Sequence, residues 1–552
     1  MDLLLIYAPK NNNFYNLLGY FTLGNLIPMG LLAIADYVES RGHAARALHL
    51  SAEELSNSSF DLGDYVAHAN PRIAAFSLHW HYQSARVIDE ARKLKQRFPD
   101  LPILLGGYTA GLFADEILRG HPEIDYIIRG EGEVPTAKLI ETLKSGGDLS
   151  AVPNLSLRID DMVQHNPIAF VAGRRFLSEL RFDRYELLEN ANLYFENFNH
   201  VLHSLSYPQI LRKKLLPSGQ IGHIVCVGRG CPVECSYCGG SKGPVEKATG
   251  RSHVTFRSIE SIIKELHSVS RRGISRLYFP QDPYPTSNFY PRLFDAIRTE
   301  GLQFGAAFES FGLPPERLID AFAKTFNSDD KSFIFISVET GDEKLRKNNR
   351  GYFFSNDDLL ERLGYIEKIG LHFNICYTLG LPGESRESLE ATNRLWNTIR
   401  RRYRFLTSQS ATIIRLDPGS PAQCDPSKFQ IRAAAESFET LLATHRNTHR
   451  ESLGGWSHLP MNHECPTLLP ENNTGAARQT ERILAVYKCR HFCPLFDKGP
   501  FPYPINKVLC AVVGAFFRFE GRYIRRIESR IAPHQVERGE MISSATGKRD
   551  FG

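Results

Sequence analysis

Cys231-Pro-Val-Glu-Cys235-Ser-Tyr-Cys238 places three cysteines within eight residues. Thiolates are soft ligands that suit zinc or iron–sulfur centres. A structural zinc site usually takes four protein ligands, and no fourth cysteine or histidine lies close in the sequence. Three thiolates can instead hold a four-iron cluster in which one iron stays open to another ligand. The triad therefore predicts an iron–sulfur site, with a zinc site as the alternative.

Downstream of residue 220, short apolar runs alternate with amphipathic stretches, without the turn signals of hairpins. The predicted strands are His223–Val227, Arg276–Phe279, Phe304–Phe308, Phe333–Val338, Phe373–Thr378 and Ala411–Leu416. The predicted helices between them include Ser258–Ser270, Pro315–Phe326, Asp357–Ile369 and Glu387–Arg400. Six such units predict a (β/α)6 partial TIM barrel that is active at the carboxyl ends of its strands. The three cysteines directly follow the first strand, so we expect them at this rim.

The first 150 residues show a similar alternation, which is typical of a flavodoxin-like, Rossmann-type α/β domain with a parallel sheet. The predicted strands are Leu3–Tyr7, Ala45–Leu50, Ile73–Leu78, Ile103–Leu105 and Tyr126–Ile128. The predicted helices are Met29–Ser40, Ser84–Phe98 and Ala110–Arg119. Glycine-rich turns follow the last two strands, at the sheet edge where such domains bind ligands.

The predicted organisation has four parts. A domain over 1–150 is followed by an irregular connecting segment (151–219), the barrel (220–425), and a mostly helical C-terminal region (426–552) with a disordered tail from Gly539. We expect the substrate-facing residues in the connecting segment and the C-terminal region.

The overall composition is that of a globular protein, with 552 residues, 42% hydrophobic and 23% charged. A formal net charge of only +5 argues against a dedicated nucleic-acid-binding protein. No apolar run approaches the ~20 residues that span a bilayer, and the start, MDLLLIYAPK, predicts a strand and not a signal peptide. We therefore expect a cytoplasmic protein with reduced cysteines.

The cysteine triad, with Tyr237 before its last member and a (β/α)6 block around it, resembles the radical SAM superfamily. The resemblance implies a [4Fe-4S] cluster held by Cys231, Cys235 and Cys238. Its open iron would chelate S-adenosylmethionine (SAM), from which one electron releases a 5′-deoxyadenosyl radical.

Four further segments resemble motifs of the same superfamily in the same order. They are Tyr278-Phe279-Pro280-Gln281-Asp282, Ser337-Val338-Glu339-Thr340-Gly341, the turn Gly380–Ser385, and Ile414–Pro421. The first departs from the more usual Gly-Gly-Glu or Asp-Asp pair, so only its last two residues carry over. The implied SAM-binding residues are Tyr237, Gln281, Asp282, Ser337, Glu339, Gly341, Leu381, Gly383 and Arg415.

The N-terminal domain resembles the cobalamin-binding domain of one radical SAM subgroup. The implied cobalamin-binding residues are Pro28, Gly30, His79, Trp80, His81, Gly106, Gly107, Tyr108, Thr109, Gly130, Glu131, Gly132 and Glu133. Glycines suit this role because backbone can approach a large flat ligand where no Cβ intervenes. No D-x-H-x-x-G motif is present, so a histidine-ligated cobalt of the methionine synthase kind is not supported. Ligation of cobalt by His79 or His81, or a domain that binds no cobalamin, remain alternatives.

Together these resemblances imply a cobalamin-dependent radical SAM methyltransferase. One SAM would methylate cobalamin, and a second would generate the radical. The methyl group would then pass to an unactivated carbon, or to an aromatic or phosphorus centre, of a small molecule. We expect this molecule to belong to natural-product or cofactor biosynthesis. We expect a monomer that receives electrons from flavodoxin or ferredoxin. The alternatives are a cyclase or rearrangement enzyme that uses cobalamin without methyl transfer, and a zinc-stabilised binding protein.

Seven cysteines lie outside the triad. Cys465, Cys489 and Cys493 leave a second cluster open, although packing is the simpler interpretation because free cysteines are commonly buried. The others are interpreted as packing residues: Cys226, Cys376, Cys424 and Cys510.

Overall fold

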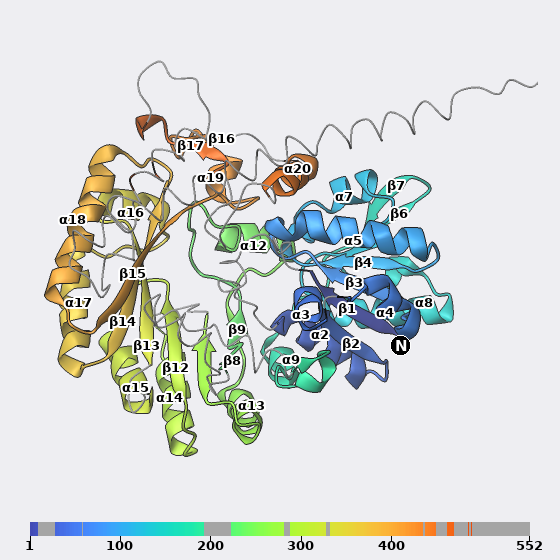
Figure 1. Cartoon of the computed structure of the whole chain (residues 1–552), viewed down its shortest axis with the longest axis horizontal. Helices are drawn as coiled ribbons and strands as arrows, with labels where there is room; N and C mark the ends of the chain where they lie inside the picture. Colours follow the sequence, from blue (N-terminus) through green and yellow to red (C-terminus); the bar gives the residue numbers. More distant parts are fainter. Residues whose placement is uncertain are drawn as a thin grey trace, which may run out of the picture.

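The computed structural model describes residues 1–8, 28–57, 59–191, 222–280, 287–326, 332–433, 437–448, 461–468, 484 and 487. Two α/β units lie side by side, and a smaller C-terminal part runs along both (Figure 1). The predicted disordered tail lies outside the described residues.

The N-terminal unit is built on a seven-stranded sheet. In spatial order its strands are β2 (Ala45–His49), β1 (Leu3–Tyr7), β3 (Ile73–Ser77), β4 (Ile103–Gly106), β5 (Tyr126–Ile128), β6 (Leu155–Ile159) and β7 (Met162–His165). The first five are parallel, and each lies within one residue of its predicted bounds. The predicted flavodoxin-like α/β unit is confirmed.

Helices cover both faces of this sheet. The apolar sides of α2 (Met29–Ser40) and α8 (Glu133–Ser145) bury one face. The other face is covered by α4 (Leu62–Ala69), α5 (Ser84–Arg97) and α7 (Ala114–Gly120). Shorter elements are α3 (Leu50–Ser56), α6 (Tyr108–Leu112), α9 (Arg174–Glu179) and the 3-10 turns η1 (His81–Gln83), η2 (Leu149–Ala151) and η3 (Tyr185–Leu187).

Two predictions for this unit are wrong. The segment expected to be irregular contains β6 and β7, an antiparallel hairpin that extends the first sheet. Only β6 buries leucines, whereas β7 is an exposed edge with almost no apolar pattern. The left-handed pair Asp160-Asp161 marks the turn, which was the available signal. The single helix predicted over Ala110–Arg119 is divided into α6 and α7 at Phe113.

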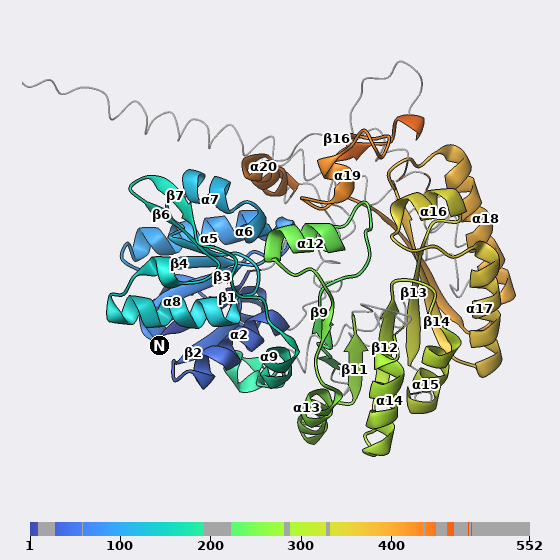
Figure 2. The same ribbon diagram turned by 180° about the vertical axis from the view of Figure 1, so that it is seen from behind.

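The second unit contains a parallel sheet of six strands in sequential order, as the predicted partial barrel requires (Figure 2). They are β8 (Gly222–Ile224), β11 (Arg276–Phe279), β12 (Gly305–Ser310), β13 (Phe333–Glu339), β14 (His372–Leu379) and β15 (Leu406–Ile413). The helices between them are α12 (Lys242–Thr249), α13 (Ile259–Arg271), α14 (Phe289–Thr299), α15 (Glu316–Phe326), α16 (Glu343–Asn349), α17 (Asn356–Ile369) and α18 (Arg386–Arg402). A partial (β/α)6 barrel is thus confirmed.

The ends of the barrel differ from prediction. The last strand begins at Leu406, five residues before the predicted start, because its first half is the polar run Thr407–Ser410. The first strand ends at Ile224, and β9 (Gly228–Arg229) then pairs with β10 (Thr255–Phe256) in a separate small sheet. The cysteines therefore follow β9 and not the first barrel strand directly.

The described C-terminal elements bridge the two units (Figure 1). They are α19 (Pro421–Cys424), β16 (Arg432–Ala433), α20 (Phe438–Thr448), β17 (His463–Glu464) and the 3-10 turn η5 (Pro466–Leu468). Helix α20 buries Phe438 and Leu441 in the core of the N-terminal unit. On β17, the ring of His463 hydrogen-bonds the carbonyl of Gly380 in the barrel at 2.6 Å. This part of the chain therefore fastens one unit to the other.

Candidate functional site

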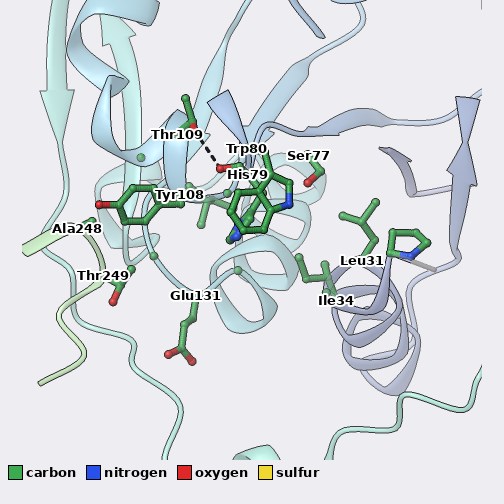
Figure 3. Close-up of a pocket in the computed structure, with 18 of the residues that line it drawn as sticks. Leu31, Ile34, Ser77, His79, Trp80, Tyr108, Thr109, Glu131, Ala248 and Thr249 are labelled. Atoms are coloured by element: carbon green, nitrogen blue, oxygen red, sulfur yellow. Dashed lines mark hydrogen bonds between the residues drawn. The ribbon is translucent and has the colours of Figure 1, made fainter. Parts of the chain in front are cut away.

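A cavity of about 720 Å³ lies between the N-terminal unit and the barrel (Figure 3). Barrel residues that line it include Arg229, Cys238, Thr249 and Tyr278. The residues predicted to bind cobalamin all line this one cavity: Pro28, Gly30, His79, Trp80, His81, Gly106, Gly107, Tyr108, Thr109, Gly130, Glu131, Gly132 and Glu133.

The sheet order explains why these loops converge. Strand β1 pairs with β2 on one side and β3 on the other, so successive connections leave in opposite directions from this point. In open parallel sheets such a switch point opens a crevice beyond the carboxyl ends of the strands. The loops after β3, β4 and β5 all end in this crevice.

Glycines shape the wall of the cavity. A Cβ on Gly30 or Gly106 would meet nothing within 4 Å, so these positions leave open space beside backbone. Gly107 is different: its φ is +106°, and a Cβ there would lie 2.7 Å from the Cα and the backbone nitrogen of His79. These open glycine walls fit a large flat ligand such as cobalamin.

His79 and Trp80 stand at the centre of the cavity, between Leu31 and Ile34 on one side and Tyr108 on the other (Figure 3). The Oε1 of Gln83 accepts hydrogen bonds from the backbone N–H groups of His79 (3.2 Å) and Trp80 (2.9 Å). The hydroxyl of Thr109 donates to the His79 carbonyl at 2.9 Å. Burial lowers the pKa of His79 to about 4, so its ring is neutral near pH 7.

The two histidines have different surroundings. His79 opens into the cavity, whereas the Nδ1 of His81 lies 2.9 Å from the Nε2 of His445 on α20. The Nε2 of His81 also lies 3.9 Å from Asp417, which follows the last barrel strand. Burial, with Arg415 nearby, lowers the pKa of His81 to about 3. His81 therefore lines the cavity and also helps to join three parts of the fold.

Glu131 and Glu133 turn their carboxylates toward the barrel. The Oε2 of Glu131 accepts from Arg229 at 2.8 Å and its Oε1 accepts from Arg251 at 2.7 Å. Glu133 forms a further ion pair with Arg229. Arg251 is 4% exposed, so the pairing is deeply buried. These carboxylates join the two walls of the cavity.

The loop between β9 and α12 carries Cys231, Cys235 and Cys238 as half-buried free thiols. Burial raises the pKa of Cys235 and Cys238, and each neighbouring thiol adds to the effect. Cys238 also lines the cavity. Three free thiols on one loop are a donor set that fits a [4Fe-4S] cluster.

Hydrogen bonds from the barrel rim hold this loop. The N–H of Ser236 donates to the Asn349 carbonyl at 2.9 Å, and the N–H of Asp417 donates to the Tyr237 carbonyl at 3.0 Å. The Asp417 carboxylate in turn accepts from the N–H of Gly239 at 3.0 Å. Backbone groups of Asn349 and Asp417 and the Asp417 carboxylate thus position the backbone on both sides of the last cysteine.

Among the described residues, no group of three or more His, Cys, Asp or Glu side chains converges on one point as a mononuclear metal ion requires. A four-iron cluster makes a different demand, because each of its three thiolates binds a different iron.

The predicted SAM residues on β13 lie next to the cysteine loop. Glu339 has a left-handed φ of +67° and forms a 2.7 Å ion pair with Arg350. Thr378 on β14 donates to its other oxygen. Glu339, Arg350 and Cys235 all lie near enough to Tyr237 to influence its pKa, which burial raises strongly. The structure thus brings Tyr237 and Glu339 together.

The other predicted SAM residues have varied positions. Ser337 lies on β13, and a Cβ on Gly341 would come within 2.5 Å of the Ala391 carbonyl oxygen. Leu381 is buried, and Gly383 has a φ of +84° in the turn after β14. Arg415 lies past the end of the last strand, where it influences the pKa of both His81 and His463. Gln281 and Asp282 lie outside the described residues.

Cys465 is fully buried against the turn after β14, with its thiol 3.5 Å from the Leu381 carbonyl. Burial raises the pKa of this thiol, as it does that of Cys238. Cys489 and Cys493 lie outside the described residues.

Several residues of the site escaped the sequence prediction. They are Arg229, Arg251, Arg350, Thr378 and Asp417. Asp417 lies in the Ile414–Pro421 motif, which was the available signal for it, whereas the other four belong to no recognised motif. The partners of these residues lie 11 to 178 residues away along the chain.

In the part of the chain that the structure describes, no helix has the length and apolar character needed to cross a membrane.

Comparison with known families matches both units. Residues 225–395 match the radical SAM superfamily, and residues 22–140 match the B12 binding domain. Among curated proteins, the chain is 25% identical over 353 residues to hopanoid C-3 methylase from Methylococcus capsulatus. This alignment covers 63% of this chain and 61% of that protein. It is 22% identical over 398 residues to an uncharacterised methyltransferase from Pyrococcus horikoshii, covering 71% of this chain and 77% of that protein.

Solved structures share the fold. The radical SAM methyltransferase TsrM from Kitasatospora setae, with tryptophan substrate and a SAM analogue bound, superposes with a TM-score of 0.61 over 95% of this chain and 99% of its own. The sequence identity is 13%. The cobalamin-dependent radical enzyme OxsB, with aqua-cobalamin and SAM bound, gives a TM-score of 0.53 at 13% identity, over 91% of this chain and 63% of its own.

Proposed function

The chain belongs to the cobalamin-binding radical SAM enzymes, and from this we propose that it transfers a methyl group from cobalamin to a small molecule. The observation that carries the proposal is the single cavity shared by the two units. The predicted cobalamin residues line it from the N-terminal unit, and Cys238 of the predicted cluster site lines it from the barrel. Methyl transfer to a radical needs the methyl donor, the substrate and the radical source within one enclosed space.

The cofactors supply the reactive chemistry: the [4Fe-4S] cluster and SAM provide the radical, and cobalamin carries the methyl group. The protein must hold these groups in order and exclude water and oxygen. Cys231, Cys235 and Cys238 would hold the cluster, while Tyr237 and Glu339 would hold SAM. The Glu131–Arg229 and Glu131–Arg251 pairs keep the two walls of the cavity together.

The substrate is proposed only as a class of molecule. One curated relative is named hopanoid C-3 methylase, of whose length the chain matches 61%, and another is named only as an uncharacterised methyltransferase. Natural-product or cofactor biosynthesis is the setting that we propose, in the cytoplasm, with a monomeric enzyme and flavodoxin or ferredoxin as the electron donor.

Anaerobic purification and cluster reconstitution test the proposal. We expect about four irons per chain, bound cobalamin, and, with a substrate, equal amounts of S-adenosylhomocysteine and 5′-deoxyadenosine. Failure of the reconstituted protein to bind cobalamin would overturn it. Zinc without iron would instead favour the zinc-stabilised binding protein.

The second candidate is a cobalamin-dependent cyclase or rearrangement enzyme. A relative named anaerobic magnesium-protoporphyrin IX monomethyl ester cyclase, from Synechocystis, is 27% identical over 216 residues. This alternative predicts 5′-deoxyadenosine without S-adenosylhomocysteine, so the same assay separates the two reactions.

A further inference from the structure

Glu309 is the penultimate residue of β12 and faces the interior of the partial barrel. Its neighbour Phe308 packs outward against Phe294 and Phe322 of the covering helices. Because side chains alternate along a strand, Glu309 turns to the opposite, inner face. Phe308 pairs with Phe279, the last residue of β11, so Glu309 lies one residue beyond the end of that strand. This places the carboxyl group at the active rim.

Glu309 is a half-buried acid that has no basic partner among the described residues. The hydroxyl of Tyr278, which lines the cavity, donates to its Oε1 and is its one hydrogen-bond partner among the described residues. Burial raises the pKa of Glu309 to about 7. Glu339 on the next strand has Arg350 as a counter-charge at 2.7 Å. An isolated buried carboxyl is costly and is typical of a functional site.

The titratable groups that face Glu309 do not neutralise it. Tyr278 comes from β11 and Cys376 from β14, and burial raises the pKa of Cys376 to about 12, so this thiol stays neutral. From β13 comes Glu339, whose charge Arg350 balances. No described lysine or arginine lies near enough to influence the pKa of Glu309. The site therefore presents a carboxyl group that an incoming cation would complete.

We propose that Glu309 binds the positively charged sulfonium of SAM, as a carboxylate that Tyr278 holds in place at the barrel rim. A sulfonium has no hydrogen to donate, so a carboxylate is its natural complement in a protein. Glu309 is paired in register with Phe335 of β13, two residues before the predicted SAM residue Ser337, and both Glu309 and Glu339 lie near enough to Cys376 to raise its pKa. The inference rests on the SAM site of the proposed function.

The experiment measures SAM binding by equilibrium dialysis on the cluster-reconstituted protein, with labelled SAM and labelled S-adenosylhomocysteine as probes. Glu309→Gln should weaken SAM binding about tenfold or more at pH 8, the range for a lost interaction with a charged group. S-adenosylhomocysteine lacks the sulfonium charge, so its binding should weaken by less than about threefold. Glu309→Asp keeps the charge and should retain more SAM affinity than Glu309→Gln.

Glu265→Gln is the matched control. Glu265 is a glutamate of the barrel that is 4% exposed and so more buried than Glu309, and it lies on α13, where it binds His223 and Arg257. Its replacement should leave the ratio of SAM to S-adenosylhomocysteine affinity unchanged. The advantage of wild type over Glu309→Gln should also grow from pH 6 to pH 8, because the carboxylate forms as the pH rises through about 7.

Three results would overturn the inference: unchanged SAM binding in Glu309→Gln, an equal loss for both probes, or an equal loss in Glu309→Asp and Glu309→Gln. If wild type itself binds no SAM, the proposed function fails instead. Thermal unfolding of each variant shows whether a loss reflects misfolding.

Discussion

Replacement of Glu131 by glutamine should loosen the contact between the two units. Its Oε1 accepts from Arg251 at 2.7 Å and its Oε2 accepts from Arg229 at 2.8 Å and from the Ala172 N–H at 3.1 Å. Glutamine retains one acceptor oxygen but removes the charge, and its NH2 group would face a guanidinium. Arg251, which is 4% exposed, would lose its buried counter-ion.

Removal of one partner from a buried ion pair costs about 3–5 kcal/mol. Since glutamine keeps part of the hydrogen bonding, we expect the lower end, about 3 kcal/mol, in the free energy that holds the N-terminal unit against the barrel. That value corresponds to about a hundredfold change in the equilibrium between docked and separated units.

Hydrogen–deuterium exchange of the cavity loops, read by mass spectrometry, measures this change, since their protection depends on docking. Glu141→Gln is the control, on helix α8, which begins two residues after Glu131. Glu141 is one-third exposed and lies 3.7 Å from Arg41, so its loss should cost less than about 0.5 kcal/mol. If the two variants exchange equally fast, the buried pairs do not hold the units together and the reasoning fails.

Three further changes have defined outcomes. Replacing all three of Cys231, Cys235 and Cys238 by alanine should reduce the iron content from about four per chain to none, whereas Cys465→Ala should leave it unchanged. An equal loss of iron in both variants would contradict the assignment of the three cysteines as the cluster ligands. Gly107→Ala should lower the free energy of unfolding by about 3 kcal/mol and release cobalamin, because the added Cβ would strike the His79 backbone. The control Gly42→Ala, at a similar φ but with nothing within 4 Å, should lower it by about 1 kcal/mol. Equal losses of the two variants in thermal unfolding would refute the steric argument. Burial raises the pKa of Glu384 from 4.5 to about 8, so between these pH values the folded protein holds a proton that the unfolded protein has lost. The free energy of unfolding should therefore fall as the pH rises from about 4.5 to about 8, and Glu384→Gln should remove this fall. Parallel pH profiles of unfolding for wild type and variant would argue against this role of Glu384.

The regular parts of the fold were predictable because their patterns are local. Parallel strands buried on both faces are continuous apolar runs, and β1 and β11 have the predicted bounds. The hairpin of β6 and β7 and the polar start of β15 were missed because an edge or interior-facing strand has few apolar residues. Periodicity cannot reveal a strand whose environment is partly polar.

The predicted site shows the same division. The cysteine spacing and the glycine-rich turns indicated the loops that line the cavity, because a loop after a parallel strand must lie at the carboxyl edge of the sheet. The directions of the side chains were not predictable. Glu131 and Glu133 turn to the barrel arginines, and His81 turns to His445 on α20.

The cysteine spacing by itself indicated a thiolate site for iron–sulfur or zinc chemistry, since three thiols within eight residues form a ligand set in any fold that exposes the loop. Only the tertiary structure decided how the two units meet. The partners Glu131 and Arg251 are 120 residues apart in the sequence. Glu309 accepts its hydrogen bond from Tyr278, which lies on a neighbouring strand 31 residues earlier in the chain. Contacts of this kind depend on where whole elements pack, and no local pattern in the chain records that.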